Sequence, residues 1–265
     1  MWRNFKNFSI LRRFNDLPKM QNFKAIIQYD GTKYNGWQIQ RNGGVTIQGK
    51  ISDVLTQMVG NQVDVVGSGR TDAGVHALGQ VANFLLPEKY DTPYILNYLN
   101  RYLPEDIAVV KIEKADERFH ARFSCKSKTY RYRINNSLIP NVFERKFIYH
   151  YTDAVIDVER MREAAKYLIG KHDFMSFCGN QHIKKSTVRT ITEVSVNKRD
   201  NEIFIDYTGD GFLQNMVRIL TGTLIDVGID KIAPESMPQI IESKKRAAAG
   251  FTAPPHGLVL LCVMY

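Results

Sequence analysis

An arginine and an aspartate two residues apart in a glycine-rich stretch are the side chains best suited to chemistry in this chain. They are Arg70 and Asp72, within the stretch 67–77, which also holds three glycines. Because glycine permits positive φ and close approach of other groups, the stretch predicts a tight loop that presents both side chains to one space. A carboxylate held beside a cation and away from water can act as a nucleophile or a general base. A glycine-rich turn in which the Asp72 side chain accepts a hydrogen bond from a nearby backbone N–H explains the spacing equally well.

The cation that would partner Asp72 comes from Arg70 or from Arg218. Apolar side chains recur at helical spacing over residues 213–227, which predicts a helix with one buried face. Arg218 projects from the other face of that helix, beside the small Gly222. A single arginine at such a place is most often a solvated surface charge, so the spacing leaves the choice between the two arginines open.

A run of basic and aromatic residues, 126–133, is the second stretch with a chemical signature. Strand alternation puts Lys128, Tyr130 and Tyr132 on one face and Arg131 and Arg133 on the other. Cations interleaved with aromatic rings suit RNA, because the cations meet phosphates and a ring stacks on an unpaired base. A half-buried antiparallel strand with its charges outward has the same pattern.

Several other chemistries have no support in the sequence. The 3 cysteines, Cys125, Cys178 and Cys262, are far apart, which argues against a disulfide framework or a zinc site and favours a reducing, cytoplasmic setting. The histidines show no spacing typical of metal ligands, and neither a nucleophile elbow nor a phosphate-binding Walker loop is present. We therefore expect no metal and no cofactor, and interpret the histidines as structural or RNA-facing.

The overall composition points to a polyanionic partner. The chain has 265 residues, of which 44% are hydrophobic and 24% charged, with a net charge of +9 and a pI near 9.4. A balance this basic favours nucleic acid first and an acidic membrane surface second. No apolar run approaches the roughly 20 residues that a membrane span needs, so we expect no membrane association.

The elements that must position these side chains repeat in two halves. Strand patterns at 23–29, 63–67, 76–85 and 107–113 alternate with helix patterns at 47–59 and 92–102, in the order β-α-β-β-α-β. The second half repeats the order, with strands at 129–134, 188–197, 202–207 and 257–265 and helices at 158–169 and 213–227. We treat a further helix at 234–244 and a loop at 174–186 as additions. The expected fold is α+β, with two pseudo-duplicated ferredoxin-like halves and a central cleft.

This pattern predicts three segments. Residues 20–124 form an N-terminal subdomain with the Asp72 loop, and residues 125–265 form a C-terminal subdomain with Tyr130 and the Arg218 helix. Residues 1–19 form a basic extension that lacks the apolar core of a secretory signal. We interpret the extension as a flexible arm that touches RNA or as the product of a start upstream of Met20, with a transit peptide as the third interpretation.

Motifs along almost the whole chain from about residue 22 resemble the TruA family of tRNA pseudouridine synthases. The main one is residues 70–77 followed by 80–84. The others stand in the family's order and are Tyr29-Asp30-Gly31, Gly36-Trp37-Gln38, Phe119-His120-Ala121-Arg122-Phe123, Lys128-Thr129-Tyr130-Arg131-Tyr132, Gly211-Phe212-Leu213, Met216-Val217-Arg218, and Ala253-Pro254-Pro255 with Gly257-Leu258.

The resemblance implies a role for each candidate residue. Asp72 matches the catalytic aspartate, Tyr130 the tyrosine that stacks on the target base, and Arg218 the arginine that pairs with the aspartate. Leu258 matches a residue that lines the uracil pocket, and Arg70 is assigned to substrate binding.

The resemblance also implies the reaction: conversion of uridine to pseudouridine at positions 38, 39 and 40 of the tRNA anticodon arm. The reaction needs no cofactor, and the family implies a homodimer in which each tRNA crosses both subunits. Whether Asp72 attacks C1′ or C6 or abstracts the sugar 2′ proton stays open.

Two other classes of protein have similar patterns. Paired RNA-recognition domains also repeat β-α-β-β-α-β, but they carry an aromatic-rich signature strand that this sequence lacks. A hydrolase that uses Asp72 or His76 would need a nucleophile or metal motif, and none is found.

Overall fold

The computed structural model describes residues 19–41 and 43–265. The expected basic extension, residues 1–19, therefore lies outside the described residues except for Lys19.

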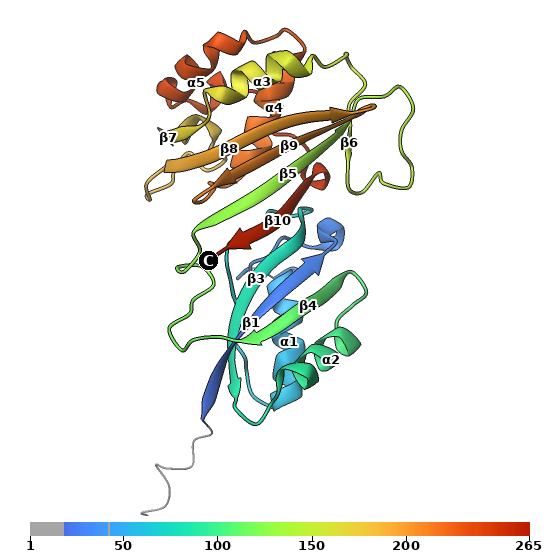
Figure 1. Ribbon diagram of the computed structural model, residues 1–265, viewed down its shortest axis with the longest axis vertical. Coiled ribbons are helices and arrows are strands. Elements are labelled where there is room, and N and C mark those ends of the chain that lie inside the picture. The colour runs from blue at the N-terminus through green and yellow to red at the C-terminus, as the bar shows by residue number, and fades with distance from the viewer. Residues whose placement is uncertain (1–18, 42) are drawn as a thin grey trace, which may run out of the picture.

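One sheet runs through the molecule and is flanked by five α-helices in the described chain (Figure 1). The strands are β1 (Met20–Tyr29), β2 (Val66–Gly67), β3 (His76–Pro87), β4 (Ile107–Lys114), β5 (Ser127–Asn135), β6 (Tyr149–His150), β7 (Gly170–Asp173), β8 (Val188–Arg199), β9 (Glu202–Gly209) and β10 (Leu258–Met264). The helices are α1 (Ile47–Val59), α2 (Thr92–Tyr102), α3 (Val158–Lys166), α4 (Met216–Gly228) and α5 (Met237–Ser243).

The sheet order is β4-β1-β3-β10-β5-β9-β8-β7, with β2 beside β3 and β6 beside β5. The last strand of the chain, β10, joins the two halves. It pairs antiparallel with β5 and parallel with the start of β3, where Val259 lies opposite His76 and Leu260 opposite Ala77. Strand β2 pairs with the middle of β3, opposite Ala82 and Asn83. We call this pairing of β3 with β10 the seam between the halves. The segment between β2 and β3 therefore returns to the sheet at the seam.

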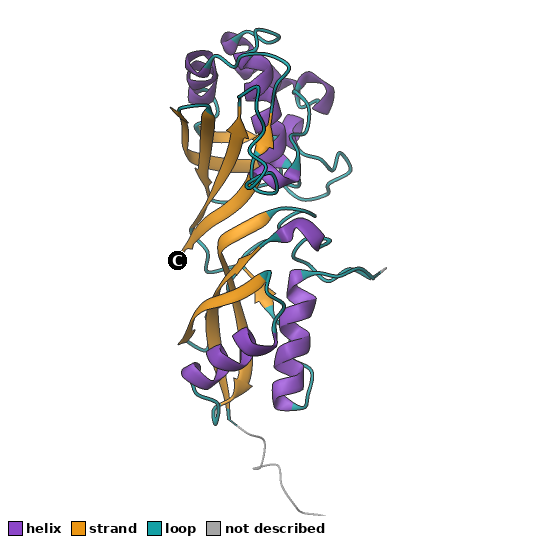
Figure 2. Cartoon of the chain, turned by 90° about the vertical axis from the view of Figure 1, so that its right-hand side faces the viewer, coloured by secondary structure: helices purple, strands orange, loops and turns teal. Residues whose placement is uncertain are grey.

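Local sequence signals account for the ends of several helices. The Thr46 side chain accepts a hydrogen bond from the Gly49 amide at the start of α1, and Gly60, with φ of 81°, ends that helix. Asp91 and Asp157 cap α2 and α3 in the same way. Helix α4 is buried along almost its whole length and contacts both α3 and β5. Most helices gather on one side of the strands (Figure 2).

Four expected elements differ from the structure. Pairing shortens the strand expected at 63–67 to Val66–Gly67. The helix expected at 213–227 begins at Met216, because Asn215 takes a left-handed conformation with φ of 59°. The helix expected at 158–169 ends at Lys166. The helix expected at 234–244 is a 3₁₀ turn, Pro234–Ser236, followed by Met237–Ser243.

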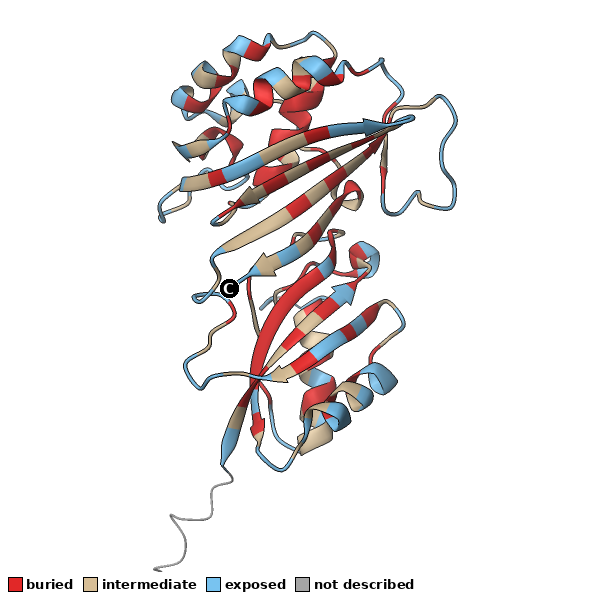
Figure 3. Ribbon diagram, viewed as in Figure 1, coloured by how far each residue is buried: buried red, intermediate tan, exposed pale blue. Residues whose placement is uncertain are grey.

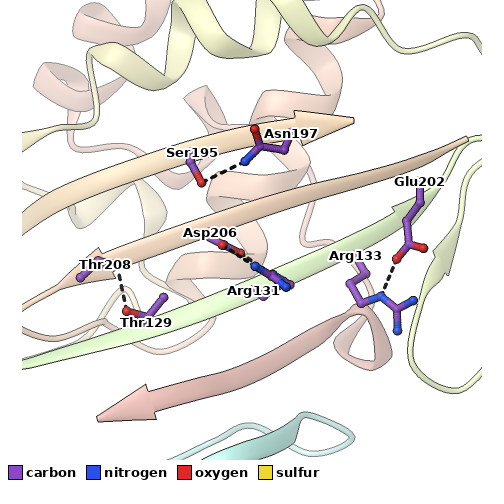
Figure 4. A network of polar contacts seen from close by, with 8 residues as sticks. All are labelled: Thr129, Arg131, Arg133, Ser195, Asn197, Glu202, Asp206 and Thr208. Carbon is purple, nitrogen blue, oxygen red and sulfur yellow. Dashed lines mark hydrogen bonds and ion pairs between the residues drawn. The ribbon is translucent and has the colours of Figure 1, made fainter. Parts of the chain in front are cut away.

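The basic and aromatic strand alternates as expected. On β5, Tyr130 and Tyr132 are buried, whereas Arg131 and Arg133 turn to the other face. There Arg131 pairs with Asp206 at 2.7 Å and Arg133 with Glu202 at 2.5 Å, both on the neighbouring β9 (Figure 4). Both arginines are therefore already paired with carboxylates of the same sheet.

The seam between the halves depends on a glycine. Strand β3 is buried along most of its length (Figure 3). A Cβ at Gly79 would lie 2.4 Å from the carbonyl oxygen of Leu261 on β10, which is closer than real Cβ atoms approach. The absence of a side chain at Gly79 thus lets β10 lie directly against β3.

No helix among the described residues is long and apolar enough to cross a membrane.

Candidate active site

The loop between β2 and β3 is held at its first end by hydrogen bonds to both halves of the chain. The Ser68 amide donates to the carbonyl of Val81 at 2.7 Å. The Ser68 hydroxyl donates to Oε1 of Gln80 at 2.7 Å, and Nε2 of Gln80 donates to the Gly69 carbonyl at 3.1 Å. From the second half, Nζ of Lys128 donates to the Ser68 carbonyl at 2.8 Å. The loop is therefore fixed by its own strand and by β5.

The centre of the loop packs against the segment that follows β1. The Thr71 hydroxyl hydrogen-bonds the buried Tyr29 hydroxyl at 2.8 Å, and the Thr71 carbonyl accepts from the Trp37 amide at 3.1 Å. Gly36, with φ of +85°, allows this contact, because a Cβ there would lie 2.5 Å from the Thr71 carbonyl oxygen. Thr71 is thus fixed on both sides, and Asp72 follows it directly.

Arg218 is the cation that meets Asp72. Its Nη1 lies 3.8 Å from Oδ2 of Asp72, and the two side chains are 15% and 29% exposed. The guanidinium is itself held in place, since Nε donates to the Ala253 carbonyl at 2.7 Å and Nη1 to Oδ1 of Asn215 at 2.9 Å. Arg70 is exposed, and no ion pair joins it to Asp72 among the described residues. The sequence left open which arginine partners Asp72, and in the structure the partner is Arg218.

Burial makes Asp72 a stronger base than an ordinary aspartate. Desolvation raises the pKa of the Asp72 carboxyl, while the Arg218 charge and the Asn215 backbone amide lower it in part. Asn215 precedes the first turn of α4, so the carboxylate also lies at the positive end of that helix. Desolvation likewise lowers the pKa of the Arg218 guanidinium, against the opposing effect of Asp72. Arg218 thus stabilises the Asp72 carboxylate anion in a partly desolvated place. Such an anion suits nucleophilic attack or proton abstraction.

Tyr130 lies close to this pair. It is buried on β5 and packs edge-on against Phe212, with ring centroids 5.2 Å apart. Burial raises the pKa of its hydroxyl, and the nearby Tyr29 and Asp72 raise it further. The hydroxyl makes no hydrogen bond to any residue that the structure describes.

Leu258 is buried at the start of β10, opposite Tyr132 on β5. The Tyr132 hydroxyl donates to the Pro254 carbonyl at 2.7 Å, which ties the segment before β10 to the same strand. Gly257 is required there, because a Cβ would lie 2.7 Å from the Tyr132 ring. Leu258 is therefore a buried apolar residue on the strand next to the one that carries Tyr130.

Sequence reasoning missed one residue that the site contains. Asn215 contacts both Asp72 and Arg218, and the only signal for it was an asparagine just before a helical pattern. His76, which the sequence suggested was structural or RNA-facing, is buried. Its Nδ1 accepts from the Gly31 amide at 3.0 Å and lies 3.2 Å from Asp30, and burial lowers its pKa. Within the described chain, no group of three or more His, Cys, Asp and Glu side chains is placed to hold a metal ion.

The expected cleft between the halves differs from the cavity that the structure contains. A cavity of about 530 Å³ at the junction is lined by residues from both halves, including His76, Arg131, Phe147 and Leu261, but not by Asp72, Tyr130 or Arg218. It opens on the face of β5 that carries the paired arginines. The carboxylate with a raised pKa and its cation therefore lie outside this cavity.

The chain is similar to proteins of known family. A family model described as tRNA pseudouridine synthase matches residues 25–124 and 164–265. The protein named tRNA pseudouridine synthase A of Acetivibrio thermocellus is 47% identical over 246 residues, which cover 93% of this chain and 100% of that protein. The protein of the same name from Bacillus sp. KSM-64 is 47% identical over 243 residues, covering 91% of this chain and 98% of its own. A solved structure of an unknown protein from Galdieria sulphuraria aligns at 11% identity over 72% of this chain and 81% of its own with a TM-score of 0.23, which is too low to indicate a shared fold.

Proposed function

The chain belongs to the tRNA pseudouridine synthase family, and from this premise we propose that it isomerises uridine to pseudouridine at positions 38, 39 and 40 of the tRNA anticodon stem-loop. The observation that carries the proposal for the site is the Asp72–Arg218 pair at 3.8 Å beside the ring of Tyr130. The sequence motif that resembles the family's catalytic motif contains Asp72.

The reaction moves one bond and leaves the composition of the nucleotide unchanged. The bond from N1 of uracil to C1′ of the ribose breaks, the uracil turns, and C5 bonds to C1′. The hydrogen on C5 leaves to solvent and N1 gains one, so nothing is oxidised or reduced. The target uridine must leave its stack to reach the site, as substrates of other base-modifying enzymes do.

Each candidate residue has a part in this reaction. The Asp72 carboxylate attacks C1′ or C6 or removes the 2′ proton, and any of these steps requires the anion that Arg218 stabilises. The Tyr130 ring supports the uracil by stacking, with its hydroxyl available to the substrate. Leu258 contributes an apolar wall to the uracil pocket. The exposed Arg70 contacts the RNA at the rim of the site.

The proposal extends to the architecture of the molecule. The strand order β4-β1-β3 with β2 beside β3 in the first half and β10-β5-β9-β8 in the second supports a duplicated ferredoxin-like unit. The enzyme acts as a homodimer in which each tRNA contacts both subunits, and it acts in the cytoplasm without a cofactor. The net charge of +9 supports the binding of a folded RNA through its phosphates.

Tritium release tests the function directly. A tRNA transcript labelled with tritium at C5 of uridine is incubated with the enzyme, and radioactivity in water is measured. Pseudouridine formation must free this hydrogen, whereas binding alone or hydrolysis of the RNA backbone leaves it on the base. Transcripts in which uridines 38, 39 and 40 are replaced by cytidine serve as the control. Release that persists from the control transcripts would contradict the assignment of positions, and no release from any transcript would contradict the activity.

A further inference from the structure

Lys128 lies beside the active-site loop without an acidic partner, and two arginines act electrostatically on it. Lys128 comes from β5, Arg189 from β8 and Arg122 from the segment before β5. None of the three forms an ion pair with a carboxylate among the residues that the structure describes. This contrasts with Arg131 on the opposite face of β5, which pairs with Asp206.

The charges of Arg122 and Arg189 both act on the Lys128 ammonium. Burial lowers the pKa of the Lys128 ammonium, and the positive charges of Arg122 and Arg189 lower it further, although the neighbouring Cys125 opposes them. Arg189 is held by its own loop, since Nη1 donates to the carbonyls of Ser186 at 2.9 Å and Val188 at 2.6 Å. A partly buried ammonium beside like charges is destabilised until an anion joins it.

The Lys128 ammonium has N–H donors left for such an anion. An ammonium has three N–H donors, and one of them goes to the Ser68 carbonyl at 2.8 Å. On the loop side, Gly69 leaves the ammonium uncovered, because the position of a Cβ there would be 3.0 Å from Nζ. An oxyanion can therefore approach Lys128 next to the loop that carries Asp72.

The position of the cluster matches one part of the substrate. Lys128 and Tyr130 are alternate residues of β5, so their side chains leave the same face of the strand roughly 6.6 Å apart. That spacing is comparable with the reach of one nucleotide from its base to its phosphate. A uracil on the Tyr130 ring would thus place a neighbouring phosphate at Lys128.

We propose that Lys128, Arg122 and Arg189 form a phosphate site that binds the phosphodiester flanking the target uridine. The inference rests on the proposed function, since it uses a uridine stacked on Tyr130. In the bound complex the phosphate neutralises the cluster and fixes the nucleotide relative to Asp72. Lys128 then links the RNA backbone to the loop through Ser68.

The simpler account is that Lys128 only ties the loop to β5 through its bond to Ser68. Two variants separate these roles. Lys128→Gln keeps an N–H donor for the Ser68 carbonyl and removes the charge, and Lys128→Arg keeps the charge. Arg122→Gln and Arg189→Gln do not touch the loop and test the site even if the Lys128 variants are unstable. Lys198→Gln, at an exposed lysine on β8, is the matched control for the loss of one positive charge.

The test combines these variants with tRNAs that carry a single neutral methylphosphonate 5′ or 3′ of the target uridine. We expect the parent to bind one of these tRNAs severalfold more weakly than unmodified tRNA. Lys128→Gln and Arg189→Gln should bind unmodified tRNA more weakly than the parent does, with a slope of log Kd against log salt lower by about 1. The methylphosphonate should then reduce the affinity of these two variants little further. Lys128→Arg should behave like the parent, and Lys198→Gln should show the full loss on the methylphosphonate tRNA.

Two results would overturn the phosphate site. One is a parent that binds both methylphosphonate tRNAs as tightly as unmodified tRNA. The other is a set of losses that simply add between variant and modified tRNA, which means that the side chain and the phosphate do not meet. Tritium release by the parent from unmodified tRNA is measured on the same preparation and reports the proposed function separately, so failure of either is recognised.

Discussion

At the scale of single residues, Asp72 is the group that the proposed chemistry cannot replace. Asparagine has nearly the same shape as aspartate, so Asp72→Asn should keep the loop and its bonds through Thr71 intact. It lacks the charge needed for attack or proton abstraction, and we expect a rate loss larger than the ~10²–10⁴ of a general acid–base contribution alone. The Arg218 cation left without its partner favours phosphate, so tRNA affinity should hold or rise slightly.

Single-turnover tritium release and filter binding measure these two quantities for Asp72→Asn. Asp64→Asn, at an exposed aspartate outside the site, is the matched control. If the Asp72→Asn protein retained a tenth of the parent rate, the catalytic assignment of Asp72 would be wrong.

The pH dependence of the rate follows from the same carboxyl. Burial raises the pKa of Asp72, so the active anion takes up a proton at a higher pH than an ordinary aspartate, whose pKa is about 3.9. The single-turnover rate should therefore fall on acidification with a midpoint above that value. Arg218 lowers the pKa of Asp72, so the residual activity of Arg218→Gln should show a midpoint at still higher pH. A midpoint that stays unchanged in Arg218→Gln would mean that the titrating group is not Asp72.

Tyr130 offers two separable contributions, a ring and a hydroxyl. Tyr130→Phe keeps the ring and its edge-on contact with Phe212 and should lower turnover while preserving much of the affinity. Tyr130→Ala also removes the stacking surface, worth about 1–3 kcal/mol per base, and should weaken binding of the target further. Equilibrium binding and single-turnover rates are compared with those of Tyr102→Ala, an exposed tyrosine on α2. Parent-like behaviour of both Tyr130 variants would exclude Tyr130 as the base platform.

At the scale of elements, the start of α4 brings the cation and the anion together. Asn215 adopts a left-handed φ of 59°, which ends the preceding loop and aims its backbone amide at Asp72 and its side chain at Arg218. Left-handed geometry costs most L-residues roughly 1–2 kcal/mol, and asparagine tolerates it better than most. The strained residue therefore stands where two functional side chains meet.

Substitutions of Asn215 separate the effect of its left-handed backbone conformation from the effect of its side chain on Arg218. Asn215→Gly keeps the left-handed conformation without strain, so stability should stay near that of the parent while turnover falls, because Arg218 loses its acceptor. Asn215→Ala should lose the same activity and also about 1 kcal/mol of stability. Denaturant unfolding and single-turnover rates measure both effects, with Lys244→Gly, at another left-handed position with φ of 52°, as the control. A glycine variant as fast as the parent would show that Asn215 does not position Arg218.

At the scale of the whole molecule, the parallel pairing of β10 with β3 holds the site together. Asp72 lies in the loop between β2 and β3 of the first half, whereas Tyr130 on β5 and Arg218 on α4 belong to the second half, so the distances between them depend on this seam. The seam has few paired residues, namely Val259 with His76 and Leu260 with Ala77. Gly79 allows the strands to approach at that point.

We expect Gly79→Ala to disturb stability and activity together. Its Cβ would overlap the Leu261 carbonyl, and overpacking of this kind typically costs about 1–3 kcal/mol. The strands can relieve the overlap only by moving apart, which separates Asp72 from Arg218 and should lower the rate more than tRNA affinity. Gly211→Ala is the control for stability, because a Cβ there makes an ordinary contact of 3.6 Å with Arg189. A Gly79→Ala protein with parent-like stability and rate would show that the seam tolerates a wider spacing.

Periodicity and capping residues by themselves determined most of the helices and strands of this protein. The signals are local: Thr46 and Asp157 mark helix starts, and the alternation in β5 correctly separates Tyr130 from Arg131. The motif around Asp72 also identified the leading catalytic candidate from neighbouring residues alone. These features depend on interactions within a few residues, which a sequence displays directly.

Only the tertiary structure decided which residues meet. The choice of Arg218 over Arg70, which is much nearer to Asp72 in sequence, and the placement of Asn215 depend on strand pairing across the seam. The effect of Arg189 on Lys128 depends on the pairing of β5, β9 and β8 within the second half. The late start of the strand expected at 63–67 is also a tertiary feature, because only Val66 and Gly67 pair with β3. Such pairings join residues far apart in the chain, and backbone hydrogen bonds and close glycine contacts fix their register without leaving a local pattern in the sequence.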